Sequence, residues 1–527
     1  MRWSRSAARV LRGSARLCSH GRGVSLMALP RSLRWSIGLL AVSLLAVGCR
    51  APRQIRDPEY AGLVRQTALA TSRPEPAVLA VPPVVEGLAG PQPVEVYIEY
   101  ALTQNPDIQA ARKRVDAAAH RVPQAASLED PALAIMGFPF YPAVPQTAAG
   151  RATVKMSASQ EVPWFGTLRT RASVAEAATD VARAELAADE LRVIEQVKRA
   201  YYELYFLQKA VEITTENREL LLDLTRIAES KYRAGTVSQQ DVLRAQVEVS
   251  NLDSELIRLR QQVESAQARM AQLLHVSPDT PLGALTAIPE GQAPRDLARL
   301  YQQAVEGRPE LHAQLAEVQR QRRAVELARL AYFPNFNFSV DWAEMTTAGA
   351  MAPTADGIDD VGIGVMVNVP VYRKRLAAGV REAEGETVAS ARQYDSLRDQ
   401  TVQEVKDLFS QARSEDDLVK LFREDIIPKS EQTLEVSRSA YQVDQVDFLQ
   451  LIDNWQQLLR FQIMHHRLES ELQQTLAMLE RVVGGRLQTE VPAEPVPAPL
   501  EAEEPAFGEP GPLPPMPTPY QPQPANP

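Results

Sequence analysis

The sequence predicts a mainly α-helical fold with a small membrane β-barrel, built as two tandem repeats of helix, β-hairpin, long helix and returning helix. Three observations predict this fold. Long stretches carry apolar residues at alternating steps of three and four, the spacing of coiled-coil helices. Four short runs alternate apolar and polar residues with a period of two, as strands do. The same order of segments occurs twice along the chain.

Composition narrows the possible partners. The chain has 527 residues, of which 23% are charged, and a formal net charge of −9. This acidic balance speaks against a nucleic-acid partner, because binding to phosphates requires a basic surface. The two cysteines both lie within the first fifty residues, so the sequence offers no disulfide framework.

Residues 1–48 are interpreted as an N-terminal extension and signal peptide, with Met27 as the expected true start. The apolar run from Ile37 to Val47 is too short to span a bilayer and has the length of a secretory signal. It leads into Leu45-Ala-Val-Gly-Cys49, which resembles the bacterial lipoprotein box. The resemblance implies cleavage before Cys49 and a covalent lipid on its thiol, and a plain signal peptide is the alternative. Residues 49–92 are then a lipidated leader without helical or strand periodicity.

Residues 93–277 are expected to form the first repeat, dominated by two long helices that fold back on each other. The outgoing helix begins after Pro163-Trp-Phe-Gly166, and residues 232–243 form the tip of the hairpin. The 66 residues of the outgoing helix, 166–231, could reach about 100 Å at ~1.5 Å per residue. The coiled-coil spacing is carried by Leu191, Ile194, Val197, Tyr201, Leu204 and Leu207 on the way out, and by Val249, Leu252, Leu256, Leu259, Val263, Ala266, Met270 and Leu273 on the return.

Residues 278–484 are expected to form the second repeat. The stretch Ala101-Leu-Thr-Gln-Asn105-Pro106 is echoed by Ala304-Val-Glu-Gly-Arg308-Pro309, and the first tip is echoed by residues 441–452. Residues 485–527 form a Pro-rich tail that is expected to be disordered. The returning helix of this repeat has its seam at Leu458, Phe461, His465, Leu468, Leu472, Thr475, Leu479 and Val482.

The four predicted strands decide the architecture. They lie at 132–138, 154–159, 335–342 and 361–369, and runs of about nine residues suit tilted strands that cross a bilayer. A sheet in lipid cannot leave its edges open, and the smallest closed membrane barrels have about eight strands. One chain supplies four strands, so copies of the chain must share a barrel, and a symmetric trimer would supply twelve.

The double repeat, the two tips and the Pro163-Trp-Phe-Gly166-Thr-Leu-Arg turn together resemble the TolC-type outer-membrane efflux proteins over residues 93–484. The resemblance implies a homotrimer with a 12-stranded barrel in outer-membrane lipid and an α-helical tunnel in the periplasm. It also implies a periplasmic adaptor and an inner-membrane pump as partners. Asp130-Pro131-Ala-Leu-Ala-Ile-Met136, together with the Pro163 turn, is most similar to the heavy-metal-resistance branch.

By the same resemblance, the helix tips narrow the periplasmic mouth of the tunnel. The family usually places two acidic residues one helical turn apart there, and those positions align with Gln450 and Asp453. Three copies of Asp453 would form a negative ring that favours cations, to which Asp444 and Asp447 could add. The alternative is that these groups are solvated carboxylates of the turn.

The family also closes its mouth with hydrogen bonds between the two tips. Asp241 and Tyr441 match this latch, whereas the basic partner expected in the second tip is replaced by Val446. The alternatives are a capping role for Asp241 and simple packing for Tyr441. Gly235 is expected to supply the sharp turn of the first tip. Gly235, Val237 and Val446 are candidate adaptor contacts.

The sequence does not predict an enzyme, because it contains no P-loop, nucleophile elbow or paired catalytic carboxylates. His465 and His466 are adjacent, and we interpret neighbouring helix positions as diverging, with no carboxylate at a spacing that completes a metal site. No cofactor is therefore expected beyond the lipid on Cys49. The leading hypothesis is an outer-membrane duct for small molecules or metal cations. A secretion duct for peptides or proteins and a periplasmic coiled-coil lipoprotein scaffold without a barrel stay open.

Overall fold

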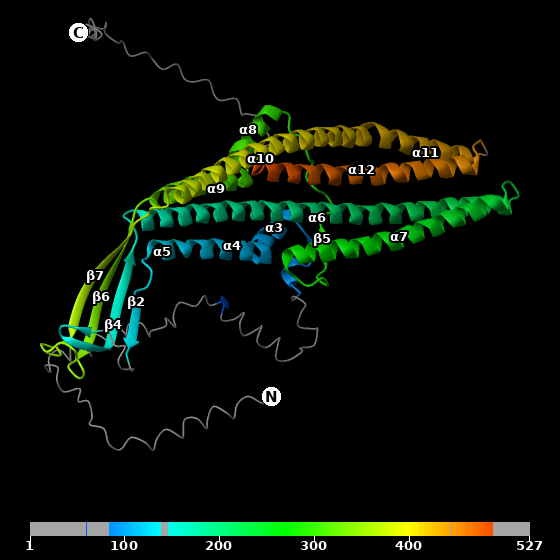
Figure 1. Ribbon diagram of the computed structural model, residues 1–527. Coiled ribbons are helices and arrows are strands. Elements are labelled where there is room, and N and C mark those ends of the chain that lie inside the picture. The colour runs from blue at the N-terminus through cyan, green and yellow to red at the C-terminus, as the bar shows by residue number, and fades with distance from the viewer. Residues whose placement is uncertain (1–58, 61–83, 139–145, 444, 488–527) are drawn as a thin grey trace, which may run out of the picture. The chain divides into compact units, whose positions relative to one another are not determined.

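The computed structural model describes residues 59–60, 84–138, 146–443 and 445–487 (Figure 1). The predicted signal peptide, Cys49, most of the leader, Asp444 and nearly all of the Pro-rich tail lie outside the described residues. The chain divides into residues 1–80 and residues 81–527, and every element considered below belongs to the second unit. Within the described ranges, no helix is both long and apolar enough to cross a membrane.

Both halves of this unit run from shorter helices through antiparallel strands into long helices. The first half contains α3 (Val94–Gln104), α4 (Pro106–Ala119), α5 (Arg121–Ala126), β2 (Ala132–Gly137), β3 (Gln146–Thr147), β4 (Gly150–Val162), α6 (Thr167–Arg233) and α7 (Gln239–Leu274). The second half contains α8 (Leu297–Gly307), α9 (Pro309–Leu330), β6 (Asn335–Thr346), β7 (Asp360–Asn368), α10 (Arg373–Leu421), the π-helix η3 (Phe422–Ile426), α11 (Ile427–Gln442) and α12 (Phe448–Val483).

The predicted long helix is confirmed to within two residues at either end. Helix α6 has 67 residues and packs along its length against α7, α9 and α12 (Figure 1). It begins after Gly166, whose φ of 88° is a left-handed conformation that glycine adopts without strain. Every predicted seam residue of α7 and α12 is buried or half-buried, so the three–four spacing marked the packed faces correctly.

The predicted strands form one sheet in the order β2-β4-β6-β7, with β3 paired to the end of β4. All these pairings are antiparallel. Strands β4 and β6 extend further than expected, to Gly150 and Thr346, beyond the predicted limits at residues 154 and 342. Strands β2 and β7 are the two edges of the sheet.

A small parallel sheet was missed by the sequence analysis. Strand β1 (Gly90–Gln92) pairs with β5 (Leu282–Ala284), and the 3₁₀ turn η2 (Glu86–Leu88) precedes β1. The hydroxyl of Tyr97 donates to the carbonyl of Gly283 at 2.9 Å and so joins this sheet to α3. The prediction of an irregular leader up to residue 92 is therefore wrong for its last seven residues, which pack into the helical body. Three-residue strands are too short to show a period in the sequence.

Candidate functional site

The register of the main sheet places most of its large apolar side chains on one face. Ile135 lies opposite Met156, which lies opposite Trp342, which in turn lies opposite Val361. The outermost positions of this face are solvent-exposed in the single chain, and Ile363 is 85% exposed. The face consists of Leu133, Ile135, Val154, Met156, Ala158, Val162, Phe336, Phe338, Val340, Trp342, Val361, Ile363, Val365 and Val367.

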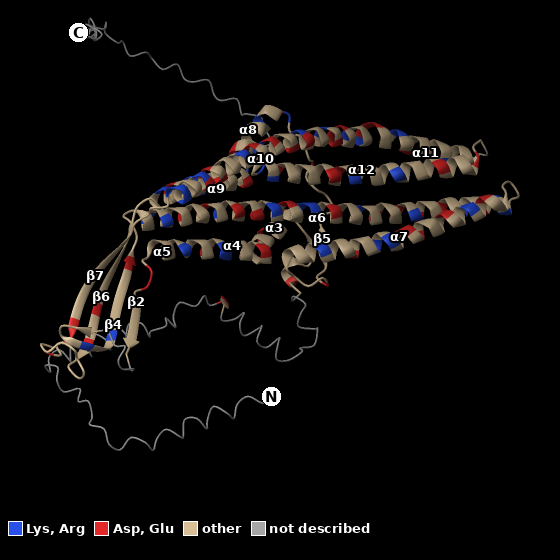
Figure 2. Cartoon of the chain, viewed as in Figure 1, with Lys and Arg blue, Asp and Glu red and all other residues tan. Residues whose placement is uncertain are grey.

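The opposite face of the sheet is polar at its centre. Lys155 forms an ion pair with Asp341 at 3.2 Å, and the Ser339 hydroxyl donates to the same carboxylate at 3.4 Å. Figure 2 shows charged residues along these strands. A sheet with one wide apolar face and one wet face suits a boundary between lipid and water.

The two helix tips share one apolar cluster. Helices α6 and α7 meet α11 and α12 around the fully buried Trp455. The members of this tip cluster are Leu221, Leu224, Ala228, Val242, Ala245, Leu252, Leu434, Tyr441, Phe448, Leu451, Ile452, Trp455 and Leu458. The cluster holds the tip of the first half against the tip of the second.

Gly235 supplies the predicted turn of the first tip. Its φ is +78°, its amide donates to the Tyr232 carbonyl at 2.9 Å, and the Thr236 amide donates to the Lys231 carbonyl at 3.0 Å. These two bonds form a Schellman motif, which ends α6 and satisfies two of its last carbonyls. Ser238 then caps α7 by accepting from the Gln240 amide at 3.0 Å.

Lys231 links the two tips, and the sequence analysis missed it. Its ammonium donates to the backbone carbonyl of Tyr441 at 2.6 Å and lies 4.8 Å from the centroid of the Tyr441 ring. The carbonyl belongs to the last turn of α11, where helix carbonyls lack partners within the helix. Tyr441 is only 3% exposed and packs against Phe448 with ring centroids 5.5 Å apart.

Asp241 lies in the first turn of α7, where Asp447 of the second tip affects its pKa. Burial and the nearby Asp447 carboxylate raise the pKa of Asp241, while the Ser238 backbone and Arg244 act in the opposite direction. The carboxylate is three residues beyond the cap, so Ser238 and not Asp241 is the capping residue.

The other predicted tip residues lie at or near the surface. Gln450, Asp453 and Asp447 are exposed in the single chain, and Val237 and Val446 are half-buried. Asp444 is outside the described residues. Sequence reasoning missed four larger apolar side chains that the tips expose: Tyr232, Leu243, Val443 and Leu449.

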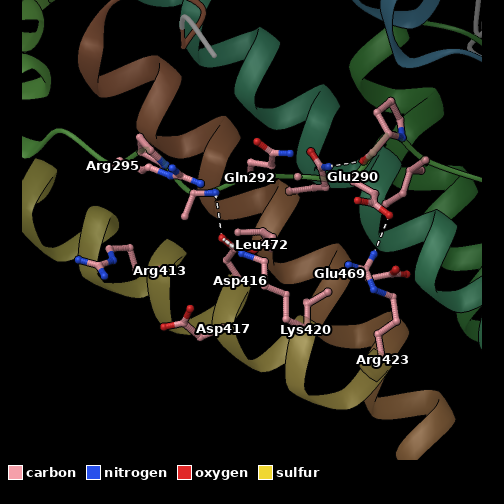
Figure 3. A pocket seen from close by; sticks show the side chains of 17 residues that line it. Glu290, Gln292, Arg295, Arg413, Asp416, Asp417, Lys420, Arg423, Glu469 and Leu472 are labelled. Carbon is pink, nitrogen blue, oxygen red and sulfur yellow. Dashed lines mark hydrogen bonds and ion pairs between the residues drawn. The ribbon is translucent and has the colours of Figure 1, made fainter. Parts of the chain in front are cut away.

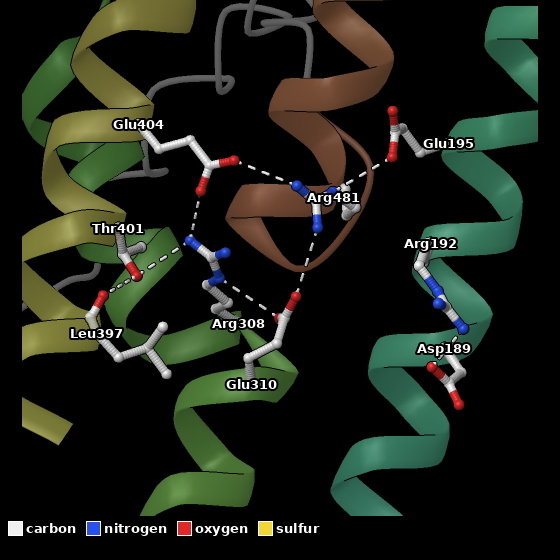
Figure 4. A network of polar contacts seen from close by, with 9 residues as sticks. All are labelled: Asp189, Arg192, Glu195, Arg308, Glu310, Leu397, Thr401, Glu404 and Arg481. Carbon is white, nitrogen blue, oxygen red and sulfur yellow. Dashed lines mark hydrogen bonds and ion pairs between the residues drawn. The ribbon is translucent and has the colours of Figure 1, made fainter. Parts of the chain in front are cut away.

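Midway along the body, a polar network joins four helices (Figure 4). The Arg481 guanidinium of α12 lies among Glu195 of α6, Glu310 of α9 and Glu404 of α10, at 3.4, 3.6 and 3.2 Å. The nearly buried Arg308 pairs with the same Glu404 at 2.9 Å. These bonds fix the second half of the chain against α6.

The chain matches a known family over both halves. Residues 97–275 and residues 300–485 each match the sequence profile described as outer membrane efflux protein. The chain belongs to the outer membrane efflux protein family. It is 22% identical over 417 residues to the cobalt-zinc-cadmium resistance protein CzcC of Cupriavidus metallidurans. This alignment covers 77% of this chain and 93% of CzcC. It is 25% identical over 252 residues to the outer membrane efflux protein BepC of Brucella suis, covering 47% of this chain and 54% of BepC.

Solved structures of other proteins share the fold of this outer membrane efflux protein. The outer-membrane channel OprN matches with a TM-score of 0.63 at 20% identity, covering 74% of this chain and 90% of OprN. CusC, whose structures concern transmembrane channel formation, matches with a TM-score of 0.64 at 16% identity, covering 76% of this chain and 93% of CusC. These TM-scores show a shared fold, whereas the low sequence identities leave the transported cargo open.

A histidine–carboxylate cluster on α12 corrects the sequence analysis of this outer membrane efflux protein. We expected no carboxylate at a suitable spacing from His465 and His466, and this expectation is wrong. Glu469 lies four residues after His465 and three after His466, so it contacts both rings, at 3.3 and 2.7 Å. The His-His-x-x-Glu pattern was visible in the sequence and is the signal that could have revealed the cluster.

Two hollows flank this cluster. Glu469 lines one of about 530 Å³, formed by the segment 288–295, α10 and α12 (Figure 3). Arg423 lines it too and pairs with Glu290 at 2.6 Å. His465 and His466 line the second hollow, of about 380 Å³.

Proposed function

We propose that this protein is the outer-membrane channel of a tripartite efflux system. In this role it passes small molecules or metal cations from an inner-membrane pump and a periplasmic adaptor to the exterior. Membership of the outer membrane efflux protein family supports the proposal, and so does the fold shared with the channels OprN and CusC. A duct of this kind works without catalysis and without a cofactor.

The observation that carries the proposal is the sheet. Most of its large apolar side chains share one exposed face, and its edge strands β2 and β7 have no further strand beside them among the described residues. In hydrocarbon, each unpaired backbone group on such an edge costs several kcal/mol, in the range of roughly 2–7 kcal/mol. Closure by three copies satisfies both edges, because β7 of one subunit pairs with β2 of the next in a 12-stranded barrel.

The helix tips are proposed to form the periplasmic gate and the docking site for the adaptor. Asp453, Asp447, Asp444 and Gln450 line the constriction in this proposal, and Asp241 and Tyr441 belong to the latch. Exposure of Asp453, Asp447 and Gln450 in the single chain supports this placement. Gly235, Val237 and Val446 contact the adaptor, together with the exposed apolar side chains Leu243 and Leu449.

We also propose that this protein belongs to the heavy-metal-resistance branch of the family. CzcC is named for resistance to cobalt, zinc and cadmium, and it is similar to this chain over most of both lengths. The acidic ring proposed at the tips suits cations. Cargo choice is expected to belong mainly to the pump. A lipid on Cys49 is proposed to hold the N-terminus in the outer membrane, while the helical body lies in the periplasm.

Planar-bilayer recordings test the channel directly. We expect steady conductance from the purified protein. Ile363→Lys places a charge on the lipid side of the barrel, at a cost of about 2–4 kcal/mol per subunit near the midplane, and should reduce insertion sharply. The matched control, Met366→Lys, lies on the same strand but on the opposite face and should still insert. A silent wild-type protein, or equal insertion by the two variants, would favour the periplasmic scaffold.

A further inference from the structure

The cluster on α12 has the composition of a metal-binding site. One ligand atom from each of His465, His466 and Glu469 lies within 4.8 Å of the other two. The Tyr205 hydroxyl of α6 donates to Glu469 at 3.3 Å and helps to orient the carboxylate.

One ring nitrogen of His465 is buried without a hydrogen-bond partner. His465 is 92% buried, with a relative exposure of 8%, and its Nδ1 atom has no hydrogen-bond partner among the residues that the structure describes. Leaving a buried polar atom unpaired costs about 1–3 kcal/mol. The other ring nitrogen, Nε2, contacts Glu469 at 3.3 Å. The His465 ring lines the hollow of about 380 Å³, which is large enough for an ion and its waters.

The charges around this hollow are compatible with a cation. Glu212 and Glu216 of α6 line it, as do Lys209 and Arg423. Each of the two basic groups has a carboxylate partner: Lys209 pairs with Glu212 at 2.7 Å, and Arg423 pairs with Glu290 at 2.6 Å. Glu216 and Glu469 therefore leave an excess of negative charge beside the histidines.

The backbone on the far side of the hollow is also unusual. Arg423 lies within η3, the π-helical segment that interrupts the long helix of α10 and α11, and Ile427 follows it directly. Single π-turns inside α-helices occur often at functional sites. Here the π-turn widens the helix next to the histidine pair.

We propose that His465, His466 and Glu469 bind one borderline divalent cation, such as Zn²⁺, in each subunit. Two imidazoles and one carboxylate form a ligand set that zinc accepts, with water in the fourth position. Ligands of a tetrahedral zinc ion at ~2.1 Å lie about 3.4 Å apart, so the three side chains must close by up to about 1.4 Å, which rotamer adjustments can supply. The ion would brace α12 on the face that meets α6 and the π-turn. This site does not depend on the proposed channel function.

Isothermal titration of metal-free, full-length protein in detergent with ZnCl₂ tests the proposal. We expect one Zn²⁺ per chain. Glu469→Gln and His466→Asn should each weaken binding at least tenfold, and Tyr205→Phe, which keeps all three ligands, should weaken it about tenfold through loss of the outer contact. Co²⁺ should give visible absorption typical of a four-coordinate site with nitrogen and oxygen ligands, and His466→Asn should abolish it.

His312→Asn is the matched control, because His312 is an exposed helical histidine whose ring contacts the Glu306 carbonyl at 2.8 Å. It should bind zinc like the wild type. Thermal unfolding of Tyr205→Phe is compared with that of the wild type. If the two proteins are equally stable, weaker zinc binding by Tyr205→Phe does not result from a folding defect. The proposal is overturned if the wild type shows no saturable binding. It is also overturned if folded Glu469→Gln, His466→Asn and Tyr205→Phe proteins all bind as tightly as His312→Asn.

Discussion

Replacing Lys231 with methionine should loosen the contact between the two helix tips. Methionine keeps the apolar stem but removes the ammonium that donates to the Tyr441 carbonyl at 2.6 Å and lies over the Tyr441 ring. The last turn of α11 then loses a cation that interacts favourably with its dipole. The apolar tip cluster around Trp455 remains in place, so the fold should persist while the tip opens more often.

The expected magnitude follows from these contacts. A hydrogen bond to a charged donor contributes about 1.5–3 kcal/mol, and a cation–π contact at a partly exposed site about 0.5–1 kcal/mol. Lys231 is only half-buried, so solvent screening reduces the sum to about 2 kcal/mol. At about 1.4 kcal/mol per factor of ten, this corresponds to a roughly 30-fold larger opening constant for the tip.

Hydrogen–deuterium exchange measures that opening directly. Amides of residues 232–238 and 439–443 should exchange roughly 30-fold faster in Lys231→Met, and single-channel recordings should show longer open times. Lys231→Arg should restore most of the protection. Arg226→Met removes a charge from the same helix and should leave exchange unchanged, because Arg226 pairs with its helical neighbour Asp223 at 2.7 Å and not with the second tip in the described residues. Equal exchange in Lys231→Met and Arg226→Met would show that the Lys231 contact does not hold the two tips together.

Three further predictions concern single side chains. Asp453→Asn should lower the cation-to-anion permeability ratio in bilayer recordings, and an unchanged ratio would remove Asp453 from the pore wall. Burial raises the pKa of Glu415, so the folded state disfavours its ionised form, and stability falls as pH rises through that pKa. Glu415→Gln should therefore raise the thermal unfolding midpoint at pH 7 and change it little at pH 4. An equal shift of the midpoint at both pH values would contradict this prediction. Cys49→Ser should abolish fatty-acid labelling, and persistent labelling would rule out that anchor.

The sequence was sufficient to predict those features that a local periodicity of apolar residues encodes. Steps of three and four marked the packed faces of α7 and α12, and alternation by two placed Met156, Trp342 and Val361 on one face of the sheet. The turn at Gly235 was predictable because few residues other than glycine adopt its positive φ without strain. These features depend on neighbours along the chain.

Contacts between distant segments could not be predicted in this way. Lys231 and the Tyr441 carbonyl are 210 residues apart, and nothing in the local pattern around Lys231 distinguishes it from other surface lysines. Arg308 was recognised only as the echo of Asn105. Asn105 caps α4 by accepting from the Asp107 amide, whereas Arg308 instead joins the ion network of four helices. The histidine–glutamate cluster is different, because its spacing is local and could have been found.

In the proposed channel, copies of the chain close one barrel by pairing β7 of one subunit with β2 of the next. The helical body lacks native cysteine, so Leu133→Cys on β2 can be combined with single cysteines at 361, 363 or 365 on β7. Within one chain, β4 and β6 separate these strands by three spacings of ~4.8 Å, or about 14 Å, which exceeds the reach of a disulfide, about 7 Å between Cα atoms.

Oxidation of these double-cysteine proteins in lipid vesicles therefore measures the shared barrel most directly. For at least one pair, we expect covalent dimers and trimers, with no larger species. A ladder that continues beyond three subunits, or chains that remain monomeric for every pair, would contradict this expectation.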